Sequence, residues 1–175
     1  MQAIIGYHFH NGKTLRDGRP LPAIGESLKH NGKIVMCLSG LHGSLLAIDA
    51  MQYAPGCWLD CCEFSGKIIN GDDKLVAKVR TTLWRVNAID AVLADARDSA
   101  LSVAHLWKQY ATKEQHDTIM LFLNGTAPYL SDDAARAAEA AAWAARAAAR
   151  AAEASPKERE SMFLKYVAEC RRRQR

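Results

Sequence analysis

The chain has 175 residues, a hydrophobic content of 49% and a formal net charge of +4, which fit one domain or one small domain with a helical extension. No apolar run approaches the roughly 20 residues that a membrane span needs, and "MQAIIGYHFH" lacks the charged and apolar regions of a secretory signal. Five cysteines without regular spacing do not predict a disulfide framework. These features argue against a membrane-spanning or disulfide-stabilised protein and predict a reducing, intracellular setting.

The first ninety residues predict a β-rich unit. The segments "AIIGYHFH", "KIVMCL", "CWLDCCEF" and "KLVAKVRTTLWRV" are typical of strands. Turn signals separate them in "HNGK", "RDGRPLP" and "NGDD", and "LLAIDAMQYA" has the spacing of a short helix that ends before Pro55-Gly56. Arg80 and Arg85 lie five apart on the last of these segments, so we expect them on opposite faces of a strand.

From Asn87 onward the apolar spacing becomes helical. Asn87 is expected to cap a helix over residues 88–111, and Thr112 with Gln115 is a capping-box candidate for the helix that follows. The stretch "SPKE" places an N-cap serine, a proline at the first helical position and a returning carboxylate in order. It therefore predicts the start of a last helix.

Strands followed by helices predict an α+β protein. We expect a small β-rich domain with one short helix over residues 1–86. A helical pair over residues 87–125 is expected next. A long Ala-rich helix and a basic C-terminal helix are expected over residues 131–175.

The stretch "DDAARAAEAAAWAARAAARAAEASP" predicts a helix of about six turns. Its larger side chains recur at intervals of three and four and fall on one line along that helix. Two interpretations stay open: the line is a recognition ridge for a partner, or it is a solvated stripe while the alanine faces pack on the domain or on another copy. The residues expected to contact a partner here are Arg136, Glu139, Trp143, Arg146 and Arg150.

The chain closes in the basic stretch "CRRRQR". Arg171, Arg172 and Arg173 would attract nucleic acid or an acidic protein surface. The simpler interpretation, which we favour, is that cations in the last turn of a helix complement its dipole.

The motif "CLSGLHGS" at residues 37–44 carries a resemblance to a known group of proteins. Together with "AIDAMQYAPG", "CEFSGKIINGDDK" and "VAKVRT", it resembles a family of uncharacterised proteins encoded by bacteriophages and prophages. Those proteins open with a small β-rich domain and often continue into Ala-Ala-Arg-type helical repeats. The resemblance covers most of residues 1–90 and implies a phage origin, but no established activity. Gly43 stands where the family usually has alanine.

The same motif also suggests a ligand pocket. His42 lies between two glycines that leave backbone room for a ligand, and its ring titrates near neutral pH. His8 and His10 share one face of the first strand, and a later strand carries Glu63. This layout resembles the ADP-ribosyltransferase-like arrangement at the level of fold only. The alternative is that His42 bonds a neighbouring turn and Glu63 lies on the surface. If the chain is an enzyme, the expected catalytic residues are His42 and Glu63, and the expected ligand-binding residues are Cys37, Gly40, Ser44, His8 and His10.

The favoured hypothesis is a phage-encoded accessory protein that acts by macromolecular binding, with inhibition of a host or antiviral-defence component as one form of that action. Its expected partner is a host or phage protein, including one in a nucleoprotein complex, and the Ala-rich helix offers a route to a homo-oligomer. No membrane, metal or cofactor is expected, and the expected location is the cytoplasm of the infected bacterial host. The alternative is a small ADP-ribosyltransferase-like enzyme that uses NAD.

Overall fold

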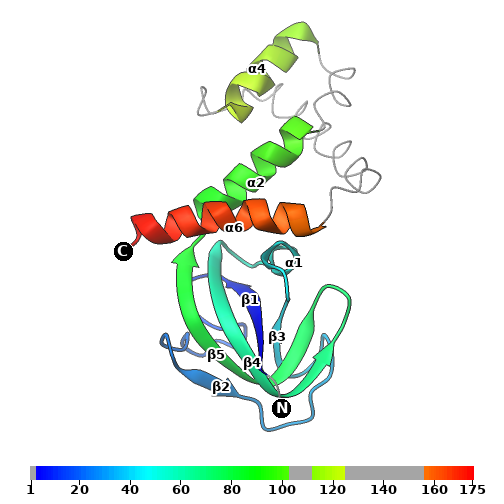
Figure 1. Cartoon of the computed structure of the whole chain (residues 1–175), viewed down its shortest axis with the longest axis vertical. Coiled ribbons are helices and arrows are strands. Elements are labelled where there is room, and N and C mark those ends of the chain that lie inside the picture. Colours follow the sequence, from blue (N-terminus) through cyan, green and yellow to red (C-terminus); the bar gives the residue numbers. More distant parts are fainter. Residues whose placement is uncertain (1–2, 103–111, 125–155) are drawn as a thin grey trace. The chain divides into compact units, whose positions relative to one another are not determined.

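The computed structural model describes residues 3–102, 112–124 and 156–175 (Figure 1). The chain divides into two compact units, residues 1–92 with 159–175 and residues 93–158. The strands of a five-stranded antiparallel sheet come first in the chain, and all described helices except α1 come after them, which confirms the predicted α+β class. In the described ranges, none of the helices combines the length and apolar character that spanning a bilayer would require.

The bounds of the described strands and helices follow in chain order. They are β1 (Ile4–His10), β2 (Ser27–Lys29), β3 (Leu41–Gly43), α1 (Ala47–Met51), β4 (Trp58–Asn70), β5 (Leu75–Asn87), α2 (Ile89–Ser102), α4 (Lys113–Leu123) and α6 (Pro156–Arg173).

Strands β1, β4, β5 and β3 are hydrogen-bonded into a closed ring. The order of the sheet is β1-β4-β5-β2, and β3 pairs with the same edge of β5 as β2 but nearer the start of β5. Tyr7 of β1 and Ser44, which follows β3, exchange two backbone hydrogen bonds of 2.8 and 3.0 Å, so β1 meets the chain again beside β3. The buried ring of Phe64 lies against both Gly6 and Gly43: a Cβ atom at Gly43 would overlap the ring, and one at Gly6 would touch the ring and overlap the Ser44 carbonyl. Glycine at these two positions therefore lets the ring of strands close around Phe64.

The long β4–β5 hairpin contains the feature that decides which side chains share a face. Its turn is the predicted "NGDD" segment. Cys61 pairs with Trp84 while Cys62 pairs with Thr82, so Leu83 is an extra residue in β5. Because of this bulge, Arg80 pairs with Phe64 and Arg85 pairs with Asp60. Phe64 and Asp60 lie four residues apart on β4, so both arginines share one face of the sheet. The prediction that the two arginines face opposite ways is therefore wrong.

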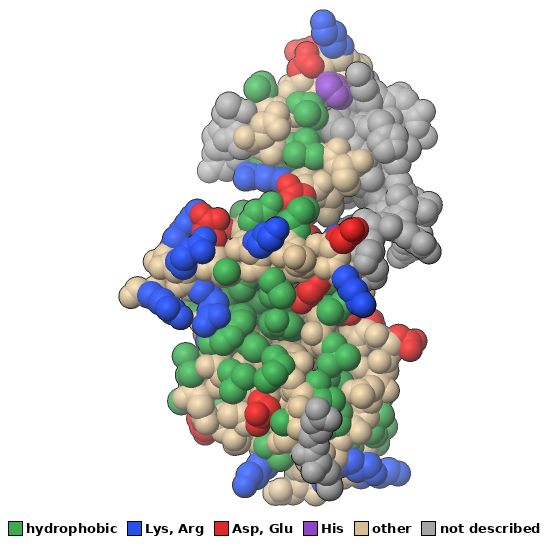
Figure 2. All heavy atoms as spheres, viewed as in Figure 1, with side chains coloured by type: hydrophobic (Ala, Val, Ile, Leu, Met, Phe, Trp, Pro, Cys, Tyr) green, Lys and Arg blue, Asp and Glu red, His purple; other side chains and the backbone are tan. Residues whose placement is uncertain are grey.

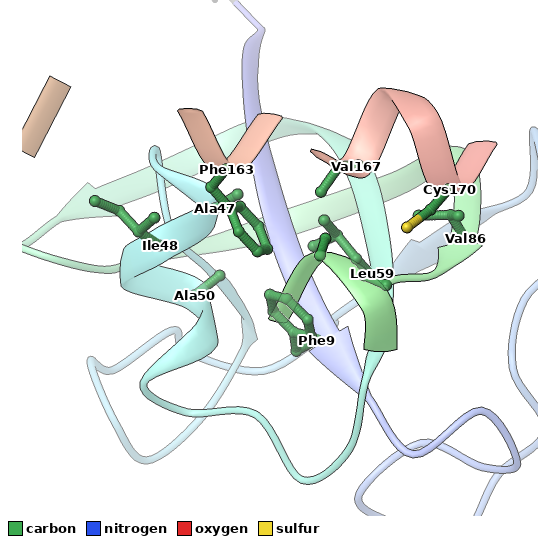
Figure 3. Packing of buried hydrophobic residues seen from close by; sticks show 11 residues of the cluster. Phe9, Ala47, Ile48, Ala50, Leu59, Val86, Phe163, Val167 and Cys170 are labelled. Carbon is green, nitrogen blue, oxygen red and sulfur yellow. The ribbon is translucent and has the colours of Figure 1, made fainter. Parts of the chain in front are cut away.

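The face of the sheet opposite to Asp60 and Phe64 is apolar and is covered by α1 and α6 (Figure 3). Phe9, Leu59 and Val86 come from three adjacent strands and are at most 3% exposed. Phe163 and Val167 of α6 pack into the same cluster. The last helix thus completes the core of the sheet unit, although almost seventy residues separate it from the last strand.

Most of the predicted element positions are confirmed. The first strand, the hairpin and the short helix before Pro55 are present, and Asn87 caps α2 because its Oδ1 accepts a 3.2 Å hydrogen bond from the Ile89 amide. The last helix begins at Pro156 as expected. Ser155, which we expected to cap this helix, and the Gln115 side chain lie outside the described residues.

The prediction of a strand in "KIVMCL" is wrong. Val35 and Ser39 bridge a tight turn, and the Leu38 amide donates a 3.1 Å hydrogen bond to the Val35 carbonyl. Cys37 at the tip has a φ of 62°, a left-handed conformation that no strand residue adopts. The next strand is instead β3, which lies within the "CLSGLHGS" motif.

The second unit is described only in part. Within it, the guanidinium of Arg97 on α2 lies 5.8 Å from the ring centre of Phe122 on α4. Ile119 of α4 is 2% exposed. The segment predicted to form an Ala-rich helix lies outside the described residues, and so do the residues predicted there to contact a partner, Arg136, Glu139, Trp143, Arg146 and Arg150.

Candidate functional site

A buried ionic network lies on the inner face of the sheet, centred on Asp60. Arg85 grips this carboxylate with two hydrogen bonds, 2.7 Å from Nε to Oδ1 and 2.8 Å from its terminal nitrogen to Oδ2. His10 Nε2 lies 3.1 Å from Oδ1, and the Thr82 hydroxyl donates to Oδ2 at 3.3 Å. Asp60 is 1% exposed, so each of these contacts is sheltered from water.

The protonation of this network is set by its partners. Burial alone would raise the pKa of Asp60, but hydrogen bonds from Arg85 and His10 outweigh it and lower that pKa to about 2. His10 Nδ1 accepts a 3.0 Å hydrogen bond from the Gly12 amide, so Nε2 is the ring nitrogen that donates to Asp60. Both ring nitrogens of His10 and both oxygens of Asp60 are therefore already engaged.

Three aromatic rings line the same face. The rings of His8 and His10 lie 6.3 Å apart and nearly parallel, and the ring of Trp58 follows at 6.5 Å from His10. The expectation that His8 and His10 share a face is confirmed. Burial, followed by the charge of Arg80, lowers the pKa of His8 well below its usual value, so His8 is neutral at neutral pH.

Arg80 is a second buried guanidinium in this region, and it is bonded quite differently from Arg85. It is 4% exposed, and one terminal nitrogen donates a 2.9 Å hydrogen bond to the carbonyl of His42. Its Nε is buried without a hydrogen-bond partner. Burial lowers the pKa of Arg80, but a guanidinium remains charged at neutral pH.

His42, the residue that the sequence singled out, lies on β3 beside Arg80. Its Nε2 is also buried without a hydrogen-bond partner. Burial is the largest cause that lowers the pKa of His42. Hydrogen bonds between its ring and the backbone of Gly40 and Val35 oppose this, and the nearby charges of Arg80 and Lys74 lower the pKa further. The structure therefore places a neutral imidazole with an open nitrogen next to a charged guanidinium.

The other predicted site residues are dispersed. Glu63 is in register with Ile5 and Thr81, one residue out of phase with Asp60 and Cys62, so it lies on the opposite face of β4. It is not the carboxylate of the inner face; Asp60 is.

The remaining predicted residues of the motif lie in a turn or take part in backbone contacts. Cys37 is exposed at the tip of its turn. Gly40 has a φ of 122°, and a Cβ atom there would overlap the side chain of Val76. Ser44 is buried and pairs with Tyr7 through its backbone. Within the described ranges, no three His, Cys, Asp or Glu side chains are grouped as metal ligands would be.

Sequence reasoning missed Asp60, Thr82, Arg80 and Arg85. One signal was available: "CWLDCCEF" places a single aspartate among apolar strand residues, and a buried carboxylate requires partners. The partners themselves could not be chosen, because the extra residue Leu83 sets the register and nothing in the local sequence marks it.

Another residue that the sequence reasoning missed, Glu160, joins α6 to α1. Its Oε1 accepts a 2.8 Å hydrogen bond from the Ala47 amide, and its Oε2 accepts one of 3.0 Å from the Ile48 amide. Glu160 is 7% exposed, and α1 has no side-chain cap of its own. The carboxylate thus satisfies two free amides at the start of α1.

The basic end of α6 is fixed to the end of β5. The guanidinium of Arg171 lies 4.1 Å from the ring centre of Trp84. Gln174 exchanges two hydrogen bonds of 3.1 and 2.9 Å with the backbone of Asn87. Arg172 is exposed, and Figure 2 shows Lys and Arg side chains gathered at this end of the helix. The prediction that three arginines occupy the last turn is confirmed.

Comparison of the chain with protein-family models, with curated proteins and with solved structures finds no match.

Proposed function

We propose that this chain is a phage-encoded accessory protein that acts in the cytoplasm of the infected host by binding an acidic protein surface. The contact surface is the basic end of α6, defined here as Arg171, Arg172, Arg173 and Arg175 with Trp84 beneath them. The resemblance of "CLSGLHGS" and its neighbouring segments supports the phage origin. A host or antiviral-defence protein is the expected target.

The observation that carries this proposal is the anchoring of Arg171 over Trp84. A guanidinium on an aromatic face is held in one place, and Gln174 ties the same turn to the sheet, so the basic end is a preorganised surface. Arginine and aromatic residues are also enriched in protein interfaces. A helix dipole accounts for the positions of these cations, but it does not require that one of them stack on a tryptophan.

Charge is distributed in a way that favours an acidic partner. The unit made of residues 1–92 and 159–175 holds sixteen Lys and Arg against ten Asp and Glu, a net charge of +6. Residues 93–158 hold seven against nine, a net charge of −2. Such an asymmetry speeds encounter with an oppositely charged surface.

Protein fits this surface better than nucleic acid does. Arg173 lies 2.7 Å from Glu169 and 3.6 Å from Asp90, so carboxylates alternate with the arginines. A phosphate backbone rewards uninterrupted positive charge, whereas mixed charge beside an aromatic ring is typical of the rim of a protein interface.

Binding is favoured over group transfer because the buried acid-base pair is already bonded on every side. Asp60 is held by Arg85, and His10 uses one nitrogen for Asp60 and the other for a backbone amide. The NAD-dependent alternative, centred on His42 and Glu63, stays a prediction. Incubation with labelled NAD and cell lysate tests it, and label transfer that His42→Ala abolishes would favour it over binding alone.

The binding proposal is tested by reversing charge. Affinity capture and cross-linking from infected cells identify a partner, whose Kd is then measured for the wild type and for Arg172→Glu/Arg175→Glu. We expect affinity to fall at least about tenfold, while the matched control Lys29→Glu/Lys67→Glu, exposed on other parts of the unit, keeps it. Equal affinity in the wild type and the Arg variant, or equal loss in both variants, would overturn the proposal.

A second measurement separates the partner classes. Fluorescence anisotropy with labelled single-stranded and duplex DNA at about 0.15 M salt should show no specific binding. Binding at that salt concentration that disappears in Arg172→Glu/Arg175→Glu would replace the acidic protein by nucleic acid as the partner.

A further inference from the structure

We propose that the sheet interior binds a small oxyanion, namely phosphate or the phosphate group of a small ligand, between the Arg80 guanidinium and His42 Nε2. This site is independent of the basic end of α6, so the two proposals can fail separately.

The first support is a charge imbalance inside the protein. Two buried or half-buried guanidiniums face one buried carboxylate, and Arg85 occupies both oxygens of Asp60. Within the described part of the chain, no carboxylate oxygen lies within 4.0 Å of a nitrogen of Arg80. The charge of Asp60 favours the Arg80 guanidinium only from a distance, so a bound anion would supply the direct partner that the described chain does not.

The second support is the position of the open nitrogens. Arg80 Nε and His42 Nε2 are both buried and without a partner. The two residues already touch, since Arg80 donates to the His42 carbonyl. A guanidinium presents its N–H groups in a planar fork that matches an oxyanion, and His42 Nε2 adds one more hydrogen-bonding atom, a donor to a phosphate oxygen or an acceptor from a P–OH group according to its tautomer.

The surroundings do not repel an anion. Burial raises the pKa of the Cys62 thiol to about 12, so this neighbour of Arg80 is uncharged. The charge of Asp60 is neutralised by its bidentate contact with Arg85. The anion would be small, or would lie at the tip of a ligand, because the two open nitrogens have almost no contact with solvent.

Thermal unfolding and calorimetric titration of the full chain test the site. Sodium phosphate, sulfate and AMP are compared with sodium chloride at matched ionic strength. Ligands that bind only the folded state raise the Tm, and the rise grows with the logarithm of the ligand concentration relative to its Kd. We expect phosphate or AMP to raise the Tm more than chloride does. We also expect Arg80→Met to abolish the difference and the exposed control Arg19→Met to keep it.

The AMP and phosphate arms identify the source of the group. Tighter binding of AMP would assign the site to a nucleotide-like ligand, and equal or tighter binding of phosphate would assign it to the free anion. Because Arg80→Met could fail to fold, His42→Gln provides a second variant with an expected loss of about tenfold in affinity. A shift of the Arg80 Nε–H resonance in wild-type protein on addition of phosphate gives a readout that needs no variant. The same Tm in phosphate and chloride, with an unmoved Nε–H resonance, would overturn the proposal.

Discussion

The two faces of the same sheet are held by opposite kinds of chemistry. On one face, Phe9, Leu59 and Val86 meet the apolar side of α6. On the other face, only one residue away along β4, Asp60 is bound by Arg85 and by neighbouring polar groups. The alternation of side chains along a strand thus separates a core that depends on volume from a core that depends on charge.

This contrast teaches which substitutions each face tolerates. A close-packed apolar cluster responds to lost volume, and it accepts a different side chain of similar size. A buried ion pair responds to the loss of one partner, even where the shape is unchanged, because the other charge remains buried. Substitutions that change only volume or only charge therefore distinguish the two faces.

The largest effect is expected on the apolar face. Phe163 is fully buried in the cluster between α6 and the sheet. Phe163→Ala should lower the free energy of unfolding by about 3–5 kcal/mol, because it removes a buried ring and leaves a cavity. Urea unfolding followed by circular dichroism measures this value. Phe163→Leu, which keeps more of the volume, should cost about 1–2 kcal/mol, and equal losses in both variants would contradict a volume-dependent core.

The next effect is expected on the polar face without any change of shape. Asp60→Asn keeps the size of the side chain but removes the charge that Arg85 requires, so the free energy of unfolding should fall by about 3 kcal/mol. Chemical unfolding gives the value. Asp60→Asn/Arg85→Gln should lose less than the sum of the two single variants. Strict additivity would show that the two charges do not stabilise one another.

Acid should weaken the polar face selectively. The folded pKa of Asp60 is about 2, below the ordinary value of 3.8 that we take for the unfolded chain. The contribution of this carboxylate is therefore complete above about pH 5 and is lost as the pH falls toward 2, with about 2 kcal/mol at stake. Unfolding free energies of wild type and Asp60→Asn, measured between pH 7 and pH 2.5, should converge in acid. A constant gap over that range would contradict the shifted pKa.

The smallest effect concerns the contact between α6 and α1. Glu160→Gln replaces one acceptor oxygen by an NH2 donor, so the backbone N–H of either Ala47 or Ile48 loses its acceptor, which should cost about 1–2 kcal/mol. Glu169→Gln is the matched control on the same helix, where the loss of an exposed pair with Arg173 should leave the free energy of unfolding almost unchanged. Slower hydrogen exchange at α1 in wild type than in Glu160→Gln would localise the effect.

Local patterns were sufficient to predict the elements but not their partners. Strand composition and turn residues located β1 and the β4–β5 hairpin, and an N-cap and a proline located the starts of α2 and α6. The turn at Cys37 was mistaken for a strand because its composition is apolar, while the left-handed backbone that reverses the chain has no marker there.

The site was less predictable because it depends on register and on distant contacts. The shared face of His8 and His10 follows from simple alternation and is confirmed. The shared face of Arg80 and Arg85 depends on one extra residue, which alternation cannot foresee. The sequence could not link Glu160 to α1, since its two partners lie 113 and 112 positions away in the chain.

The seating of α6 has a consequence for synthesis. On the ribosome, the strands of the sheet emerge well before Phe163, Val167 and Cys170, which cover their apolar face. At roughly 5–20 residues per second, the intervening segment leaves Phe9, Leu59 and Val86 uncovered for several seconds in every nascent chain. Ribosome-bound chains halted before residue 159 should therefore bind hydrophobic dyes or chaperones, and chains released after residue 170 should not.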